Sequence, residues 1–128
     1  MKSWSGSAAV CFNENGELLM VRAFGSDEWA VPSGGIEEGE TPECCCIREV
    51  KEETGYDVEV IEELKIKEVT IQGIEVKTYY FRVEKNGESD GFEDPDGIIA
   101  ETDWKSTDEI KVLKHAYPDD RGFLLQQF

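Results

Sequence analysis

The sequence predicts an α+β fold, built as a single domain over residues 1–128. Strand-like patterns occur before and after one long amphipathic segment at residues 42–54, which has the periodicity of a helix. The chain has 128 residues, enough for one hydrophobic core but not for two. Hydrophobic residues make up 39% of the chain, a composition typical of a folded globule rather than a disordered segment.

The first predicted element is a β-hairpin. Residues 7–12 and 18–23 have strand composition, and they flank residues 13–16, which read Asn-Glu-Asn-Gly. Asn-Gly is a strong signal for a tight turn between antiparallel strands. We therefore expect these two segments to pair with each other.

Residues 42–54 are predicted to form the long helix. Thr41 is a suitable N-cap, Pro42 suits the first helical position, and Gly55 is the expected residue after the last turn. At about 100° per residue, one direction collects a mostly apolar stripe that we expect to face the core. Its members are Glu43, Cys46, Ile47, Val50 and Thr54.

Three carboxylates share the neighbouring side of this helix. Glu49, Glu52 and Glu53 fall in an arc of about 100° that borders the stripe. Two bare charges about 4 Å apart cost on the order of 4 kcal/mol at an effective dielectric constant near 20. A divalent cation, which prefers oxygen ligands, turns this repulsion into attraction. Arg48 can pair with Glu52 at the i,i+4 spacing. The cluster predicts a metal site, with a phosphate ester held by the cation as substrate.

Strand patterns resume after the helix. Residues 58–66 alternate imperfectly between apolar and polar side chains, and Glu62 breaks the alternation. We predict a strand with a bend or bulge near residues 61–63. Residues 76–83 are rich in β-branched and aromatic side chains and predict a second strand, which a turn at Asn-Gly 86–87 ends.

An acidic loop is predicted at residues 88–97, followed by a strand at 97–104. Residues 94–97, Asp-Pro-Asp-Gly, fit turn chemistry better than a calcium loop, because the other ligands of an EF-hand are missing.

Two short helices are predicted at the end of the chain. Ser106 or Thr107 can cap a helix that runs through Ile110. Residues 118–127 predict a terminal helix, which Gly122 weakens.

The charge of the chain limits its partners. The net charge is −16, whereas non-specific nucleic-acid binding needs a basic surface, so nucleic acid is not the expected partner. Anionic substrates would also be repelled unless bound cations reverse the local sign. No apolar run approaches about 18 residues and no signal-peptide pattern opens the chain, so we expect no membrane partner and a cytoplasmic location.

The four cysteines are Cys11 and the run 44–46. Adjacent helical residues point about 100° apart, so the run cannot hold one metal. Cys46 is predicted to lie in the core. Cys45 falls on the carboxylate side, one turn before Glu49, and is interpreted as a small packing residue, with a functional or oxidation-sensitive thiol as the alternative. Reduced thiols suit a cytoplasmic protein.

A few side chains allow two interpretations. Tyr79, Tyr80, Phe81 and Trp104 are interpreted as core residues, with stacking on a nucleobase as the alternative. His115, the only histidine, is interpreted as a surface or helix-end residue, with proton transfer as the alternative.

The segment 34–56 reads GGIEEGETPECCCIREVKEETGY. The spacing of its first glycine, Glu40 and the REVKEETGY run resembles the box of the Nudix hydrolase family, which includes MutT-like proteins. Tyr56 stands where the family usually has an aliphatic residue. Ser33 stands where it usually has glycine, although the backbone carbonyl is retained. Upstream, residues 29–32, Trp-Ala-Val-Pro, resemble the strand that leads into the box.

The resemblance implies an α/β/α sandwich with a central mixed β-sheet and a metal site. It implies that Glu49, Glu52 and Glu53 are the metal-binding and base carboxylates and that Arg48 orients them. By the same resemblance, Glu52 and Glu53 would be the first metal ligands, and Glu49 would be a ligand or the general base. The Ser33 carbonyl would be a further ligand, and the metal would be Mg²⁺ or Mn²⁺.

The resemblance also assigns supporting roles. Gly34 and Gly55 would be turn glycines, and Glu40 would support the loop before the helix. The family often recruits one more glutamate from the acidic region, for which Glu93 and Glu101 are the candidates. A homodimer is a further possibility at the level of the family.

The implied activity is metal-dependent hydrolysis of a nucleoside diphosphate linked to another moiety. Nucleoside triphosphates, dinucleoside polyphosphates and RNA 5′ ends remain open, and the acidic surface argues most against long RNA. No proline lies between Pro42 and Pro95, which argues against the ADP-sugar hydrolases of the family, because these often have one soon after the box. The alternative is a catalytically silent module that senses nucleotides or binds proteins. The intact box glutamates favour the enzyme.

Overall fold

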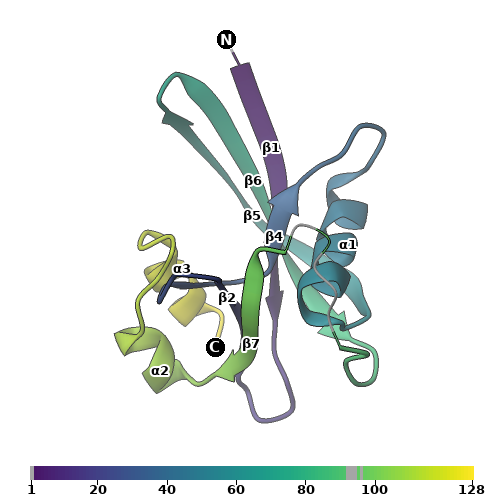
Figure 1. Cartoon of the computed structure of the whole chain (residues 1–128), viewed down its shortest axis with the longest axis vertical. Helices are drawn as coiled ribbons and strands as arrows, with labels where there is room; N and C mark the ends of the chain where they lie inside the picture. The colour runs from purple at the N-terminus through teal and green to yellow at the C-terminus, as the bar shows by residue number, and fades with distance from the viewer. Residues whose placement is uncertain (1, 92–94, 96) are drawn as a thin grey trace.

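The computed structural model describes residues 2–91, 95 and 97–128. The long strands β1, β6 and β5 run side by side. The start of β1 and the connected ends of β5 and β6 project together beyond the helices (Figure 1). In chain order the elements are β1 (Lys2–Cys11), β2 (Leu18–Ala23), β3 (Trp29–Ala30), β4 (Ser33–Gly35), α1 (Pro42–Thr54), β5 (Val58–Ile71), β6 (Ile74–Lys85), β7 (Ile99–Lys105), α2 (Thr107–Val112) and α3 (Asp120–Gln126).

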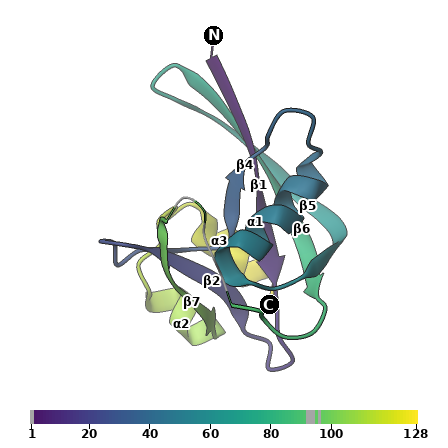
Figure 2. The same cartoon turned by 45° about the vertical axis from the view of Figure 1, so that its right-hand side comes forward.

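The strands form two sheets. The four-stranded sheet has the order β4-β1-β6-β5, in which β1 and β6 are parallel and the other pairs antiparallel. The three-stranded sheet has the order β3-β2-β7 and is antiparallel. Helix α1 lies on one side of the strands and α2 and α3 lie on the other (Figure 1), and α1 lies in front of the four-stranded sheet in Figure 2. The predicted α+β class, mixed sheet and α/β/α layers are confirmed, with the strands divided between two sheets.

The predicted hairpin is right in its turn and wrong in its pairing. The Gly16 amide donates to the Asn13 carbonyl at 3.0 Å, and one antiparallel bridge joins Phe12 to Leu18. Beyond this bridge the strands separate, β1 into the four-stranded sheet and β2 into the three-stranded one. The physical reason is burial: β1 is buried continuously over residues 6–11, so both of its edges and both of its faces need neighbours.

The other predicted strands and helices are present with shifted ends, while the predicted turn at residues 94–97 lies partly outside the described residues. In β5 the pairing register with β6 shifts between Val60 and Glu62 and again at residues 63–65, which confirms the predicted bulge. Ser106 caps α2 in a reciprocal capping box with Glu109. Within the described residues, no helix combines the length and apolar character that a membrane span requires.

Two hydrophobic clusters share the central strands. One lies toward α2 and α3 and contains Val10 and Tyr80, and the other lies toward α1 and contains Ala9 and Phe81. Because successive residues of β1 and β6 point to opposite faces, each strand contributes to both clusters. The four-stranded sheet therefore forms the middle layer on which α1 is held.

The buried side of α1 differs from the predicted stripe. The helix buries Cys45, Cys46, Val50, Glu53 and Thr54. The expectation for Ile47 and Glu43 was wrong, since both are exposed, Ile47 at 37%. Helix α1 packs against β4 as well as β1, so burial extends toward the carboxylate side of the helix. Glu53 is thus drawn into the protein, whereas Glu49 and Glu52 stay half-buried at its border, as predicted.

Candidate active site

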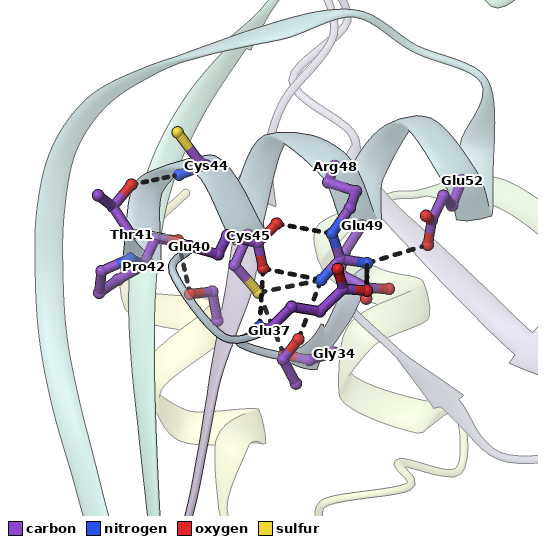
Figure 3. A network of polar contacts seen from close by, with 12 residues as sticks. Gly34, Glu37, Glu40, Thr41, Pro42, Cys44, Cys45, Arg48, Glu49 and Glu52 are labelled. Carbon is purple, nitrogen blue, oxygen red and sulfur yellow. Dashed lines mark hydrogen bonds and ion pairs between the residues drawn. The ribbon is translucent and has the colours of Figure 1, made fainter.

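The ends of α1 are fixed as the sequence predicts. The Thr41 hydroxyl accepts a hydrogen bond from the Cys44 amide at 3.1 Å, and Pro42 begins the helix (Figure 3). Gly55 follows the last turn with φ of 79°, a left-handed conformation that favours glycine. These caps set the register in which the helix presents its carboxylates.

Arg48 is the centre of the polar network on α1 (Figure 3). Its Nε and Nη2 atoms donate to the two oxygens of Glu40 at 2.7 and 2.9 Å, a bidentate pair. Its Nη1 atom donates to Glu49 at 2.7 Å and to Glu52 at 3.2 Å. Its Nη2 atom also donates to the Gly35 carbonyl at 3.0 Å. The predicted Arg48–Glu52 pair is confirmed, and the contacts of Arg48 with Glu40 and Glu49 are shorter.

These contacts shift the acidities of the network. Hydrogen bonds from the Arg48 guanidinium lower the pKa of Glu40 to about 2, and those same bonds raise the pKa of Arg48. Burial raises the pKa of Glu49, although contacts with Glu53 and Arg48 oppose this effect. Glu49 is therefore a carboxylate whose charge is costly in this position, and a nearby cation would lower that cost.

Glu53 is the most deeply placed carboxylate of the helix. Glu53 is only 8% exposed, and one of its carboxylate oxygens accepts a hydrogen bond from the Ser33 amide at 3.3 Å. The carboxylates of Glu49 and Glu53 contact each other one turn apart. A β-carbon on Gly34 would overlap the Glu49 carboxylate. Glycine at this position lets β4 approach the carboxylates closely.

A cleft of about 380 Å³ opens beside these residues. Ser33, Gly34, Glu49 and Glu53 line it, so the structure brings these four predicted residues together at one surface. Glu52 does not line this cleft and is held beside it through Arg48. The other lining residues are Val21, Ala23, Ser26, Glu28, Ala30, Val31, Gly35, Ile98, Ile99, Ala116 and Tyr117.

The two candidates for an extra glutamate have different outcomes. Glu101 pairs with Arg22 at 3.1 Å on β2 and does not line the cleft. Val21 and Ala23, on either side of Arg22, do line it, so Glu101 lies on the opposite face of the three-stranded sheet. Glu93 lies outside the described residues.

The oxygen atoms of the cleft wall suit a hard divalent cation. Glu49 and Glu53 supply adjacent carboxylates, and Ser33 supplies a backbone carbonyl on β4. In the part of the chain that the structure describes, no three acidic, histidine or cysteine side chains converge as a preformed metal site. The Arg48 guanidinium instead holds one oxygen of Glu49 at 2.7 Å and one of Glu52 at 3.2 Å. A bound cation would have to compete with Arg48 for these oxygens.

Cys45 is buried beside the network. Its thiol lies 3.5 Å from the Gly34 carbonyl, and burial raises its pKa, which supports the packing interpretation. Cys46 is buried in the core as predicted.

The remaining ambiguous side chains are mostly structural. Tyr80 and Phe81 are buried in the two clusters, and Trp104 packs edge-on against Tyr56. The expectation of a surface histidine was wrong. His115 is buried, and its Nε2 atom lies 2.9 Å from the Ile110 carbonyl in α2, so the helix-end interpretation holds. His115 also forms an isolated parallel bridge with Trp29.

Sequence reasoning missed Glu28 and Tyr117, which also line the cleft. Glu28 is one of 29 acidic residues and follows no motif, so nothing in the sequence separates it from the others. Tyr117 precedes Pro118 in a segment without strand or helix periodicity. A pairing between that segment and Trp29 would have been the signal, and only the fold reveals it.

Comparison with known proteins matches the chain to one protein family. The model of the NUDIX domain matches residues 3–127. A MutT-like protein of Streptomyces ambofaciens is 36% identical over 103 residues, which are 80% of this chain and 64% of that protein. The m7GpppN-mRNA hydrolase of Saccharomyces cerevisiae is 41% identical over 80 residues, which are 61% of this chain and 8% of that protein.

A solved structure supports the same fold. The NUDIX hydrolase from Nitrosomonas europaea has a TM-score of 0.83 and 24% identity, and the match covers 98% of this chain and 90% of that one. At this identity the likeness shows the fold alone. The matches to the two curated relatives span 64% and 8% of their lengths.

Proposed function

Because the chain belongs to the NUDIX-domain family, the Nudix hydrolases, we propose that it is a metal-dependent pyrophosphohydrolase. Its substrate would be a nucleoside diphosphate linked to another moiety, such as a nucleoside triphosphate or a dinucleoside polyphosphate. The observation that carries the proposal is the contact between Glu49 and Glu53 in the wall of a cleft of about 380 Å³. Two adjacent carboxylates, one of them 8% exposed, favour a cation at that wall.

The proposed ligands are Glu49, Glu52, Glu53 and the Ser33 carbonyl, with Mg²⁺ or Mn²⁺ as the metal. When bound, such ions neutralise phosphate charge and lower the pKa of a coordinated water. Glu53 is oriented by the Ser33 amide at 3.3 Å, which fixes one of its oxygens. Glu49 is the proposed base or a further ligand, because burial raises its pKa and so favours proton uptake.

Arg48 is a positioning residue in this proposal. Its contacts of 2.7 Å with Glu40 and 2.7 Å with Glu49 connect the loop before the helix to the carboxylates. Glu40 thereby anchors the guanidinium, and its Oε1 atom also accepts from the Glu37 amide at 3.0 Å. The loop and the helix are held as one unit, which supports the role proposed for Glu40.

Small nucleotides are the proposed substrates in preference to long RNA. The yeast relative is by name an mRNA hydrolase. The net charge of −16 gives this chain no overall basic surface for an RNA backbone. A nucleotide with two or three phosphates would be attracted through bound cations alone.

The test is hydrolysis of a nucleotide panel with Mg²⁺ or Mn²⁺, with the products identified. We expect release of a nucleoside monophosphate together with pyrophosphate or a phosphorylated fragment. Glu53→Gln should lower kcat at least about 100-fold, because the amide keeps the volume and loses the charge. Glu38→Gln is the matched control, because Glu38 is exposed and does not line the cleft.

A catalytically silent module would give a different result. It would bind nucleotides or a protein partner without turnover, and Glu53→Gln would change no rate. Turnover by Glu53→Gln equal to that of the unsubstituted protein would contradict the site assignment.

We also propose that the protein is cytoplasmic and that it forms a homodimer. Three of its four free cysteines are buried as thiols, the state that a reducing compartment maintains. Exposed apolar residues on the projecting strands, Trp4, Ile71 and Ile74, would suit a contact between copies. Light scattering of the purified protein would give the mass of a monomer if the homodimer is wrong.

A further inference from the structure

The cleft has an apolar end opposite its carboxylates. The cleft-facing residues of the three-stranded sheet are paired across strands, Val21 with Ala30 and Ala23 with Ile99. The segment after α2 extends this sheet, because Trp29 donates to the Lys114 carbonyl at 2.8 Å and accepts from the Ala116 amide at 2.9 Å. The sheet therefore presents an apolar floor, in which Ala23, Ala30 and Ala116 are the small side chains.

This floor suits a planar ring. Three alanines lie beside the branched side chains of Val21 and Ile99 and give an apolar surface against which an aromatic heterocycle can lie. Tyr117, held next to Ala116 by the pairing with Trp29, lines the same cleft and is 56% exposed. An exposed aromatic ring beside an apolar floor is the arrangement in which bases stack.

Glu28 carries the charged side chain among the described residues that line this end of the cleft. Continuation of the β2–β3 register places it opposite Ala23, in the row that Ile99 completes. Its amide donates to the Ser26 hydroxyl at 3.0 Å, which fixes the turn that carries it. Among the described residues, the half-buried Glu28 carboxylate makes no hydrogen bond or ion pair, although it lines the cleft. Both of its oxygens are therefore available to a ligand.

We propose that this apolar end binds the nucleobase of the substrate and that Glu28 selects guanine. This inference rests on the proposed function, since it assigns the base to the cleft whose other wall carries Glu49 and Glu53. Guanine presents two adjacent donors, the N1–H and the exocyclic N2 amine, and a carboxylate accepts both in a bidentate pair. Adenine presents a bare N1 acceptor at the corresponding edge, which a carboxylate repels. Hypoxanthine keeps the N1–H and lacks the amine, so it is the intermediate case.

The kinetic test compares kcat/KM for GTP, ITP and ATP with Mn²⁺. We expect GTP to exceed ATP by about 10-fold or more, with ITP between them, since a bidentate pair to a base discriminates by about that factor or more. Glu28→Gln should lower kcat/KM for GTP at least about 10-fold more than for ATP, mainly through KM. Tyr117→Ala should lower kcat/KM for all three nucleotides alike, because stacking depends little on the identity of the base.

Asp27→Asn is the matched control for Glu28→Gln. It makes the same change of charge at the adjacent residue, whose exposed side chain pairs with Lys114 at 3.4 Å and does not line the cleft. We expect Asp27→Asn to keep the GTP-to-ATP ratio of the unsubstituted protein.

A second arm separates this inference from the proposed function. Calorimetric titration with GMP and AMP needs neither a phosphoanhydride nor turnover, and we expect tighter binding of GMP, lost in Glu28→Gln. A GMP preference without any hydrolysis would uphold the base site and refute the pyrophosphohydrolase. Hydrolysis of GTP and ATP with equal kcat/KM would overturn the guanine assignment. If Glu28→Gln lowered kcat/KM equally for all nucleotides and also weakened Mn²⁺ binding, Glu28 would be a metal ligand. That result would likewise overturn the guanine assignment.

Discussion

Arg48 shows how one side chain can organise a cluster of acids. Its planar guanidinium reaches Glu40 with two nitrogens, and it contacts Glu49 and Glu52 with the third. Lysine carries a single charged nitrogen and cannot reproduce the bidentate geometry. The negative charges that would repel one another are thus partly neutralised before any metal binds, which lets the helix fold without one.

Replacing Arg48 by lysine tests this account. We expect Arg48→Lys to lower the free energy of unfolding by about 2 kcal/mol, since charge-assisted hydrogen bonds are lost. The same variant should lower kcat/KM on the order of 100-fold through misplaced carboxylates. Denaturant titration and steady-state kinetics measure the two effects. A lysine variant with unaltered stability and rate would show that the charge alone suffices.

The low pKa of Glu40 predicts a stability effect with a definite pH window. The folded-state pKa of about 2 lies below the ordinary value of 4.5, because Arg48 hydrogen-bonds the ionised form. Ionised Glu40 therefore stabilises the fold above about pH 4.5, and this contribution is lost as the pH falls toward 2. We expect Glu40→Gln to be less stable than the unsubstituted protein at pH 7, with the difference shrinking between pH 4.5 and 2. Urea titrations at several pH values measure this, and a difference independent of pH would refute the explanation.

At the scale of elements, α1 is fixed by its two ends. At the C-terminal end, the Gly55 carbonyl accepts from the Asp90 amide at 3.0 Å, and the Ser89 hydroxyl donates to the Thr54 carbonyl at 2.6 Å. A β-carbon on Gly55 would overlap the Gly91 carbonyl. The glycine therefore ends the helix and also lets the following loop close on it.

Two glycine-to-alanine substitutions should have opposite effects. Gly55→Ala should destabilise the protein by more than about 1 kcal/mol, because it combines a left-handed φ with an overlap on Gly91. Gly122→Ala should stabilise it by about 0.5 to 1 kcal/mol, since Gly122 is helical and its β-carbon would meet open space. Thermal unfolding of the two variants measures both signs. A stabilised Gly55→Ala protein would contradict the role assigned to this cap.

The sequence predicts local elements well and their partners poorly. The bounds of α1 and the bulge in β5 follow from caps and from broken alternation, which are local signals. The exposure of Ile47 depends on β4 packing against the far side of the helix, which periodicity does not contain. The separation of β1 and β2 depends on β6, more than 60 residues away in the chain.

The residues of the candidate site also divide into those that local sequence predicts and those that depend on long-range pairing. Glu49, Glu53 and Arg48 were predictable because the helix alone places their charges together. Glu28 and Tyr117 come from separate loops that meet only through the pairing at Trp29. The part of the cleft that depends on long-range pairing was thus beyond what the sequence could predict.

At the scale of the whole molecule, the two hydrophobic clusters depend on each other. β1 and β6 contribute alternate residues to both, so we expect the two clusters to open together. We propose that residues 1–128 fold as one domain for this reason.

One cooperative unfolding transition is therefore expected. Met20→Ala in one cluster and Val50→Ala in the other should each lower the stability of the same transition by about 2 kcal/mol or more. Far- and near-ultraviolet circular dichroism should give coincident curves. A second transition in either variant would show that the clusters unfold separately.

The strongly negative net charge of the molecule is the reason that the proposed metal matters for binding an anionic substrate. With a net charge of −16, the protein as a whole repels a polyphosphate, and a bound cation would reverse the sign of the charge locally. The central claim is that Glu49 and Glu53, in contact at the cleft wall, are that place.

Mn²⁺ titration followed by electron paramagnetic resonance tests this claim most directly. We predict that the unsubstituted protein and Glu38→Gln bind Mn²⁺ with equal affinity and that Glu53→Gln binds it at least about 10-fold more weakly. Equal Mn²⁺ affinity in all three proteins, or no binding by any of them, would contradict the account.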